Sequence, residues 1–273
     1  MEISFTKMQG CGNDFIFLDC LKKDIPNLGA IAGKLCDRRF GIGADQLLTI
    51  HPSKVADFKM EIYNADGSQV EMCGNGIRCF AKYVYDHGIT QKRELEVETL
   101  GGIIRPRLVG ELVEVDMGEP ILEGRKIPVD ADGQIINRPL TVDDAAYQVT
   151  CVSMGNPHCV LYLDDIDSLD LKKIGPRFEH HPFFPKRVNT EFVKIVSPKE
   201  VRMRVWERGA GETWACGTGA SAVSVAGAIT DRTEREVTIH VKGGDLLIEW
   251  RDNNRVYMTG GAEEVFHGMV KIN

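Results

Sequence analysis

Cys73-Gly74-Asn75-Gly76 is matched 143 residues later by Cys216-Gly217-Thr218-Gly219. The same offset joins three further pairs of polar residues in unchanged order: Asn13 with Asn156, Gln46 with Asn189, and Asn64 with Glu207. Chance could supply one matched motif, whereas several at one spacing indicate that a single unit has been duplicated. The chain is therefore predicted to fold as two similar halves.

Strand and helix patterns recur in both halves. Residues 58–63 and 201–206 alternate with the two-residue period of a strand, and residues 77–86 and 220–229 have the character of helices. Further strands are expected at 95–100, 113–117, 237–242 and 256–258. The expected fold class is α+β (mixed α/β) with two homologous domains. Each is a mostly antiparallel strand barrel around a central helix, with the active site in the interdomain cleft.

The first domain is expected at 1–117 plus 263–273 and the second at 118–262, so that each carries one of the two cysteines. The end of the chain is assigned to the first domain. Residues 264–272 follow the second copy in the same way that residues 121–129 follow the first copy. Residues 130–147 are expected to form an irregular connection.

Composition narrows the functional classes. The 273 residues are 43% hydrophobic and 27% charged, as in ordinary globular proteins. A net charge of −7 disfavours nucleic acid and anionic membranes as partners. A basic-then-apolar leader and a membrane-length apolar run are both lacking, so a cytoplasmic protein is expected. Its eight cysteines have neither Cys-x-x-Cys nor zinc spacing, which predicts reduced thiols and no metal site.

The paired motifs suit proton transfer. A cysteine at a helix N-terminus is more easily ionised, because the helix dipole and the exposed N–H groups stabilise a thiolate. The N–H groups of Gly74, Asn75, Gly217 and Thr218 are predicted to bind a carboxylate. A lone Cys-Gly-x-Gly turn would more often be structural, but two equivalent turns favour acid–base chemistry on both faces of one carbon.

The two copies differ at titratable positions. His158 takes the place of Phe15, and Glu207 takes the place of Asn64. We expect His158 and Glu207 to set which thiol is ionised. The alternative is a buried structural histidine and an ion pair between Glu207 and Arg208. The cysteines at positions 11, 20, 36, 79, 151 and 159 lack a partner in the repeat and are predicted to be structural.

Short amides at matched positions suit recognition of ammonium and carboxylate groups, and Arg208 offers a fork for a carboxylate. The alternative is that the asparagines merely form turns. The candidate amides are Asn13, Gln46, Asn64, Asn156 and Asn189.

These motifs resemble the diaminopimelate epimerase family along essentially the whole chain. The resemblance also rests on Gly41-Ile42-Gly43-Ala44-Asp45-Gln46, Asn64-Ala65-Asp66-Gly67-Ser68, Gly155-Asn156-Pro157-His158 and Glu207-Arg208-Gly209. It implies a cofactor-independent enzyme, usually a homodimer, that interconverts LL- and meso-2,6-diaminopimelate in the biosynthesis of lysine and peptidoglycan precursors.

The resemblance also implies roles for individual residues. Cys73 would donate the proton and Cys216 would accept it in the LL-to-meso direction, with His158 and Glu207 tuning the thiol pKa values. The implied substrate-binding residues are Asn13, Gln46, Asn64, Gly74, Asn75, Asn156, Asn189, Glu207, Arg208, Gly217 and Thr218.

Three alternatives stay open from the residues alone. A proline-type racemase also uses two cysteines but needs no receptor for a second amino-acid centre. The related phenazine-biosynthesis isomerases do not rely on a cysteine pair. A non-catalytic amino-acid-binding protein would tolerate loss of the cysteines. A thiol redox protein would carry a Cys-x-x-Cys motif.

Overall fold

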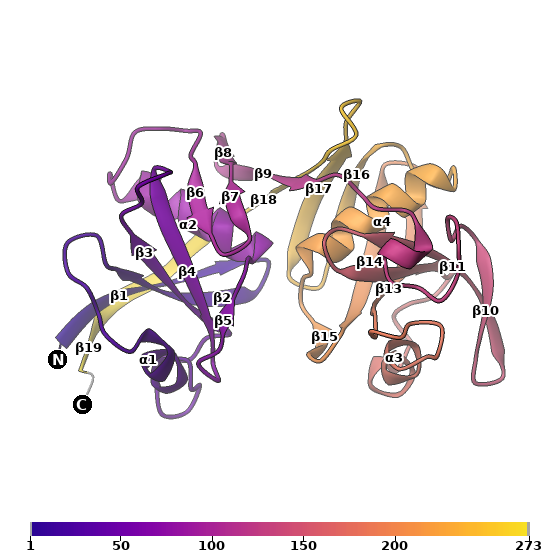
Figure 1. Ribbon diagram of the computed structural model, residues 1–273, viewed down its shortest axis with the longest axis horizontal. Helices are drawn as coiled ribbons and strands as arrows, with labels where there is room; N and C mark the ends of the chain where they lie inside the picture. Colours follow the sequence, from indigo (N-terminus) through magenta and orange to yellow (C-terminus); the bar gives the residue numbers. More distant parts are fainter. Residues whose placement is uncertain (1, 272–273) are drawn as a thin grey trace. The chain divides into compact units, whose positions relative to one another are not determined.

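A computed structural model describes residues 2–271. The chain folds into two compact units (Figure 1). Unit 1 comprises Met1–Val115 and Gly260–Asn273, and unit 2 comprises Asp116–Thr259. Each unit combines a mixed, mainly antiparallel sheet with helices, so the predicted two-domain α+β class is confirmed.

Unit 1 has strands in the order β19-β1-β2-β3-β4-β6-β7. Their bounds are Glu263–Lys271, Glu2–Gly10, Asn13–Asp19, Gln46–His51, Phe58–Asn64, Val97–Thr99 and Gly102–Ile104. The short β5 (Gln69–Val70) pairs with β4, and β8 (Pro106–Val109) forms a hairpin with β9 (Leu112–Gly118). The helices are α1 (Leu28–Leu35) and α2 (Gly74–Asp86).

The last strand of the chain belongs to the first unit. β19 pairs antiparallel with β1, from Glu2 opposite Lys271 to Gln9 opposite Glu263. Ile272, which the sequence pattern included in this strand, lies outside the described residues.

Unit 2 has the strand order β10-β11-β12-β13-β14-β16-β17-β18, and β15 (Gly211–Thr213) pairs with β14. The bounds of the ordered strands are Arg138–Val142, Ala145–Ser153, Pro157–Tyr162, Asn189–Ser197, Glu200–Glu207, Glu236–Val241, Gly244–Trp250 and Val256–Gly260. Its helices are the 3-10 turn η1 (Gly124–Lys126), α3 (Leu171–Glu179) and α4 (Gly217–Ile229).

The expectation of an irregular connection over residues 130–147 holds for residues 130–137, which form no helix or strand, but was wrong for residues 138–147. β10 and the start of β11 form an antiparallel hairpin there, with Val142 opposite Ala145. Asp143 takes a left-handed conformation at the tight turn, which an aspartate tolerates better than most residues.

The internal duplication is confirmed at the level of register. β1/β2 and β11/β12 are antiparallel, whereas β2/β3 and β12/β13 are parallel. In the parallel pairs Phe15 lies opposite Gln46, and His158 lies opposite Asn189 at the same offset of 143 residues. The two sheets therefore present corresponding positions in the same way.

The two central helices differ in how they are covered. α2 buries Ile77, Phe80 and Val84 while Lys82 and Asp86 form an ion pair on its outer side. α4 is made almost wholly of Gly, Ala, Ser, Thr and Val, and it contacts β11, β12, β13, β16 and β17. Small side chains on every face allow strands to approach α4 from several directions.

Candidate functional site

Cys73 is the N-cap of α2. Its backbone is extended, with φ −138° and ψ 117°, and its sulfur accepts a hydrogen bond from the Gly76 N–H at 3.4 Å. The half-buried thiol also lies 3.6 Å from Asn13 Oδ1, to which it donates. The thiol thus lies where the dipole and the N–H groups of the first helical turn are strongest.

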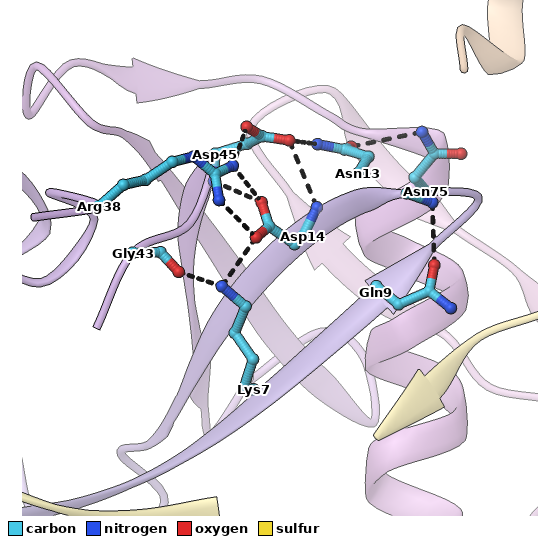
Figure 2. A network of polar contacts seen from close by, with 9 residues as sticks. Lys7, Gln9, Asn13, Asp14, Arg38, Gly43, Asp45 and Asn75 are labelled. Atoms are coloured by element: carbon cyan, nitrogen blue, oxygen red, sulfur yellow. Dashed lines mark hydrogen bonds and ion pairs between the residues drawn. The ribbon is translucent and has the colours of Figure 1, made fainter. Parts of the chain in front are cut away.

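Asn13 is held in one orientation by a charged network behind it (Figure 2). Its Nδ2 donates to Asp45 Oδ2 at 2.8 Å, and Asp45 Oδ1 accepts from Arg38 Nη2 at 2.7 Å. Because a carboxylate only accepts hydrogen bonds, the Asn13 amide must turn its NH₂ towards Asp45. Its oxygen is then left to accept from Asn75 Nδ2 at 3.3 Å and from the Cys73 thiol.

Asp14 anchors the far side of this network. Arg38 binds both of its carboxylate oxygens, at 2.7 and 2.9 Å, and Lys7 lies 2.8 Å from Oδ2 and also donates to the Gly43 carbonyl (Figure 2). Burial alone would raise the pKa of Asp14, but the hydrogen bonds from Arg38 and Lys7 outweigh it and lower that pKa to about 2. Asp14 is therefore ionised near neutral pH.

Gln46 and Asn64 face each other across β3 and β4. Gln46 Nε2 donates to Asn64 Oδ1 at 2.9 Å, and Asn64 Nδ2 donates to Ser68 Oγ at 3.0 Å. Among the described residues, Gln46 Oε1 and Asn75 Oδ1 are buried oxygens without a hydrogen-bond partner. Such oxygens are expensive to leave unpaired, which marks them as acceptors for a ligand donor.

Cys216 caps α4 in the same extended conformation, with φ −128° and ψ 108°. The thiol is buried and lies 3.5 Å from Thr218 Oγ1. Burial raises the pKa of Cys216 well above its usual range, and the charges of Glu207 and Glu191 raise it further. Gly217 lies against Met258, whose Sδ would be only 2.9 Å from an added Cβ.

Glu207 ends β14 beside Cys216. Desolvation raises its pKa, while hydrogen bonds from Thr213 and Cys216 partly offset that effect. No ion pair with Arg208 is found in the described part of the chain. Arg208 instead donates its backbone N–H to Asn189 Oδ1 at 2.9 Å and its Nη1 to the Lys186 carbonyl at 3.0 Å.

His158 is fully buried in β12. Its Nδ1 lies 2.7 Å from Glu191 Oε1, and its Nε2 lies 2.9 Å from Asn156 Oδ1. Asn189 supports the same region, because its Nδ2 donates to the Pro157 carbonyl at 2.8 Å.

Two functional residues were missed from the sequence, Asp45 and Glu191. The signal for Glu191 was a charged residue at the third position of β13, directly before the apolar Phe192 and Val193. The signal for Asp45 was its place directly before Gln46 in the Gly-Ile-Gly-Ala-Asp-Gln run.

The predicted residues form separate clusters within the units. In unit 1, Cys73, Asn13 and Asn75 are joined, with Gln46 and Asn64 forming a second pair. The Gly74 carbonyl accepts from Arg78 Nη1 at 3.4 Å, on the side of the helix turn away from its N–H. In unit 2 the clusters are Cys216 with Thr218 and Glu207, His158 with Asn156, and Asn189 with Arg208.

Four of the remaining cysteines show no sign of activation. Burial raises the pKa of Cys20 and of Cys36 to about 11, and it raises the pKa values of Cys79 and Cys159 further. Within residues 2–271 no group of His, Cys, Asp and Glu has metal-binding geometry. The described helices include none that is both long and apolar enough to cross a membrane.

The comparisons with known proteins agree with one another. The family model described as diaminopimelate epimerase matches residues 5–123 and 150–265. A relative from Acetivibrio thermocellus named diaminopimelate epimerase is 53% identical, over 98% of this chain and 99% of its own.

Two solved structures are similar in fold. A PhzF-family phenazine biosynthesis protein from Bacillus anthracis has a TM-score of 0.71 at 16% identity, covering all of both chains. A hydroxyproline epimerase from Agrobacterium vitis has a TM-score of 0.64 at 13% identity, covering 98% of this chain and 91% of its own. At these identities the likeness concerns the fold alone.

Proposed function

The chain belongs to the diaminopimelate epimerase family, and from that premise we propose how its residues interconvert LL- and meso-2,6-diaminopimelate. The observation that carries the proposal is that Cys73 and Cys216 cap equivalent helices, one in each compact unit. We assign the two domains expected from the sequence, 1–117 plus 263–273 and 118–262, as the two epimerase domains; their bounds lie within a few residues of those of unit 1 and unit 2.

The reaction needs a base on one face of the α-carbon and an acid on the other. In the LL-to-meso direction the Cys216 thiolate removes the α-proton, so that a C–H bond breaks and an S–H bond forms. The Cys73 thiol then gives its proton to the opposite face and becomes the thiolate. The raised pKa of Cys216 suits this role, because a buried thiolate is a stronger base towards a weakly acidic α-hydrogen.

The substrate carboxylate is proposed to lie at the helix N-termini. The first N–H groups of a helix lack partners within the helix, so those of Gly74 and Asn75, and of Gly217 and Thr218, are suited to bind an anion. Negative charge that moves into the carboxylate as the carbanion forms would strengthen these bonds, which lowers the barrier. The enzyme thereby needs no cofactor.

The remaining groups of the substrate have matching partners. The buried oxygens Gln46 Oε1 and Asn75 Oδ1 are suited to accept from an ammonium group. The exposed Arg208 guanidinium is suited to bind the distal carboxylate. The other substrate contacts are proposed for Asn13, Asn64, Asn156, Asn189 and Glu207.

The alternatives have less support. The 53% identical relative is named diaminopimelate epimerase, whereas the phenazine-type and hydroxyproline-epimerase folds match at 16% and 13% identity. The extra amides and Arg208 are consistent with a binding site for a second amino-acid centre of the substrate. A proline-type racemase does not need such a site. A thiol redox protein would be expected to carry a Cys-x-x-Cys motif, and the sequence has none.

Incubation of LL-diaminopimelate with the enzyme in heavy water, followed by NMR, tests the two-base reaction. We expect deuterium to enter one α-position with inversion in the wild type, and Cys73→Ser and Cys216→Ser each to abolish turnover. Cys20→Ala is the matched control, since it removes a buried thiol outside the site and should retain activity. Turnover without incorporation of solvent deuterium would refute the mechanism.

The proposed assembly is a cytoplasmic homodimer formed through the edge strand of unit 1. β19 ends the strand order, and its side chains Val265, Phe266 and Met269 are 55%, 47% and 60% exposed. An apolar edge strand is a site for strand-to-strand association. Analytical ultracentrifugation should show a dimer for the wild type and a monomer for Met269→Lys, and a dimeric variant would exclude this edge.

A further inference from the structure

The two copies place different side-chain pairs under equivalent helix N-termini. In the first copy, an added Cβ on Gly76 would lie 3.2 Å from Leu48 Cδ2 and 3.5 Å from Phe15 Cε1. In the second copy, the equivalent Cβ on Gly219 would lie 2.7 Å from Glu191 Oε1. Glu191 stands 143 residues after Leu48, as His158 stands after Phe15. An apolar pair in one half is therefore replaced by an acid–base pair in the other.

The replacement is buried completely. Phe15, Leu48, His158 and Glu191 all have 0% exposed surface. Removing two ionisable groups from water costs free energy that their mutual attraction does not always recover, whereas an apolar pair of similar size has no such cost. The first copy shows that this fold accepts the apolar pair. Stability of the fold therefore gives no reason for the charged pair in the second copy.

The hydrogen bonds show what the pair does. Asn156 Oδ1 can only accept, so His158 Nε2 carries a proton. Nδ1 lies 2.7 Å from Glu191 Oε1, and a second proton must lie between these two atoms. Glu191 Oε2 is buried without a hydrogen-bond partner among the described residues, so the carboxylate is committed to this one contact.

The pair acts on the groups that surround Cys216. Glu207 on β14 interacts electrostatically with His158 and with Glu191, and Cys216 on α4 interacts with Glu191. Glu191 also raises the pKa of Cys159, next to His158 on β12. His158 in turn lowers the pKa of Glu207, so an imidazole held in place by Glu191 bears on the charge beside Cys216.

We propose that Glu191 is a positioning residue of the epimerisation: its carboxylate binds His158 Nδ1 and fixes the imidazole in orientation beside Glu207 and Cys216. The arrangement parallels an aspartate that orients a catalytic histidine through its Nδ1–H. This inference rests on the proposed role of Cys216 as an acid–base group.

Kinetics of Glu191→Gln provide the test. We expect kcat for LL-diaminopimelate to fall by about 100-fold, the low end of what a positioned acid–base group contributes, with KM within about twofold of the wild type. Glu191→Asp should recover part of kcat, because it restores the charge with a shorter reach. Glu114→Gln is the matched control, since it neutralises a buried carboxylate paired with Arg107 in the other unit and should leave kcat unchanged.

A spectroscopic signature accompanies the kinetics. In the wild type, the proton between His158 Nδ1 and Glu191 should give a downfield imidazole N–H resonance in ¹⁵N-labelled protein. The resonance should be absent from Glu191→Gln and present in Glu114→Gln. A resonance that persists in Glu191→Gln would overturn the proposed hydrogen bond.

The outcomes separate this inference from the proposed function. If Cys216→Ser retains activity, the two-base assignment fails, and this inference fails with it. If Cys216→Ser is inactive while Glu191→Gln keeps wild-type kcat, only the role of Glu191 is refuted.

Should Glu191→Gln not fold, the double variant His158→Phe with Glu191→Leu carries the test, because it installs the pair of the first copy. A folded and inactive double variant supports a functional pair. A folded and active one overturns the proposal.

Discussion

Substitution of Gly219 by alanine tests most directly how tightly the helix N-terminus at Cys216 is packed, and the equivalent substitution at Gly76 tests the one at Cys73. In Gly219→Ala the new methyl carbon would lie 2.7 Å from Glu191 Oε1 and 3.3 Å from Cys216 Cβ. Glu191 is fully buried and hydrogen-bonded to His158, so its carboxylate must retreat by several tenths of an ångström and stretch that bond. Gly76→Ala is the matched substitution, because its methyl group meets the apolar Leu48 Cδ2 at 3.2 Å.

The two substitutions differ in expected cost. Forcing an extra methyl group into a packed interior costs about 1–3 kcal/mol, and replacing glycine by alanine in a helix returns up to about 1 kcal/mol. For Gly219→Ala we expect a net loss of about 1–2 kcal/mol in the free energy of unfolding. For Gly76→Ala the leucine methyl can move aside, so the change should stay within about 0.5 kcal/mol.

Urea denaturation measures this difference. Trp206, Trp214 and Trp250 all lie in unit 2, so tryptophan fluorescence reports the unit that carries Gly219. Far-UV circular dichroism follows both units and therefore also reports Gly76→Ala. If Gly219→Ala unfolds at the wild-type urea midpoint, or if Gly76→Ala is equally destabilised, the packing argument is refuted.

Three further outcomes are expected. The pKa of Asp14 is about 2 in the folded protein against a usual 3.8, so the pairing of Asp14 stabilises the fold above about pH 4, and this stabilisation is lost towards pH 2. Urea midpoints of the wild type and of Asp14→Asn measure the effect. The stability advantage of the wild type should shrink by about 1 kcal/mol between pH 4 and pH 2. In Gly175→Ala the added Cβ would lie 2.2 Å from Trp206 Cδ2, which should destabilise unit 2 by about 3 kcal/mol and change its fluorescence; an unchanged emission spectrum would contradict the contact. Oxidation with diamide should abolish epimerisation and dithiothreitol should restore it, because Cys73 and Cys216 are proposed to flank one carbon; full activity after both are oxidised would contradict that arrangement.

The elements that sequence patterns predicted share a strong local signal. The helix after each Cys-Gly-x-Gly run was recognisable because the motif recurs with a fixed offset, and β4 and β14 because they alternate. Helix α1 was missed because its eight residues include Gly29 and Gly33, and α3 because it contains Gly175 and Pro176. Glycine and proline lower intrinsic helix propensity, so tertiary packing decides these two helices.

Site residues could be predicted at positions where both copies of the repeat carry a polar side chain. They could not be predicted where a charged residue in one copy replaces an apolar residue in the other. The cysteines and the amides were found because each has a polar counterpart in the other half. Glu191 was missed because its counterpart is Leu48, and a search for shared residues does not detect a charged replacement. Asp45 was missed because its role depends on spatial contacts with Asn13 and Arg38 that spacing does not reveal.

The position of β19 has a consequence for synthesis on the ribosome. The strand that covers β1 follows the whole of unit 2 in the sequence. Proteins emerge amino terminus first, and domains generally fold in that order. Here all of unit 2 leaves the ribosome before unit 1 can complete its sheet. The β1 edge therefore stays uncovered until unit 2 has been translated, and nascent chains that stall between unit 2 and β19 should be the form most in need of chaperone protection.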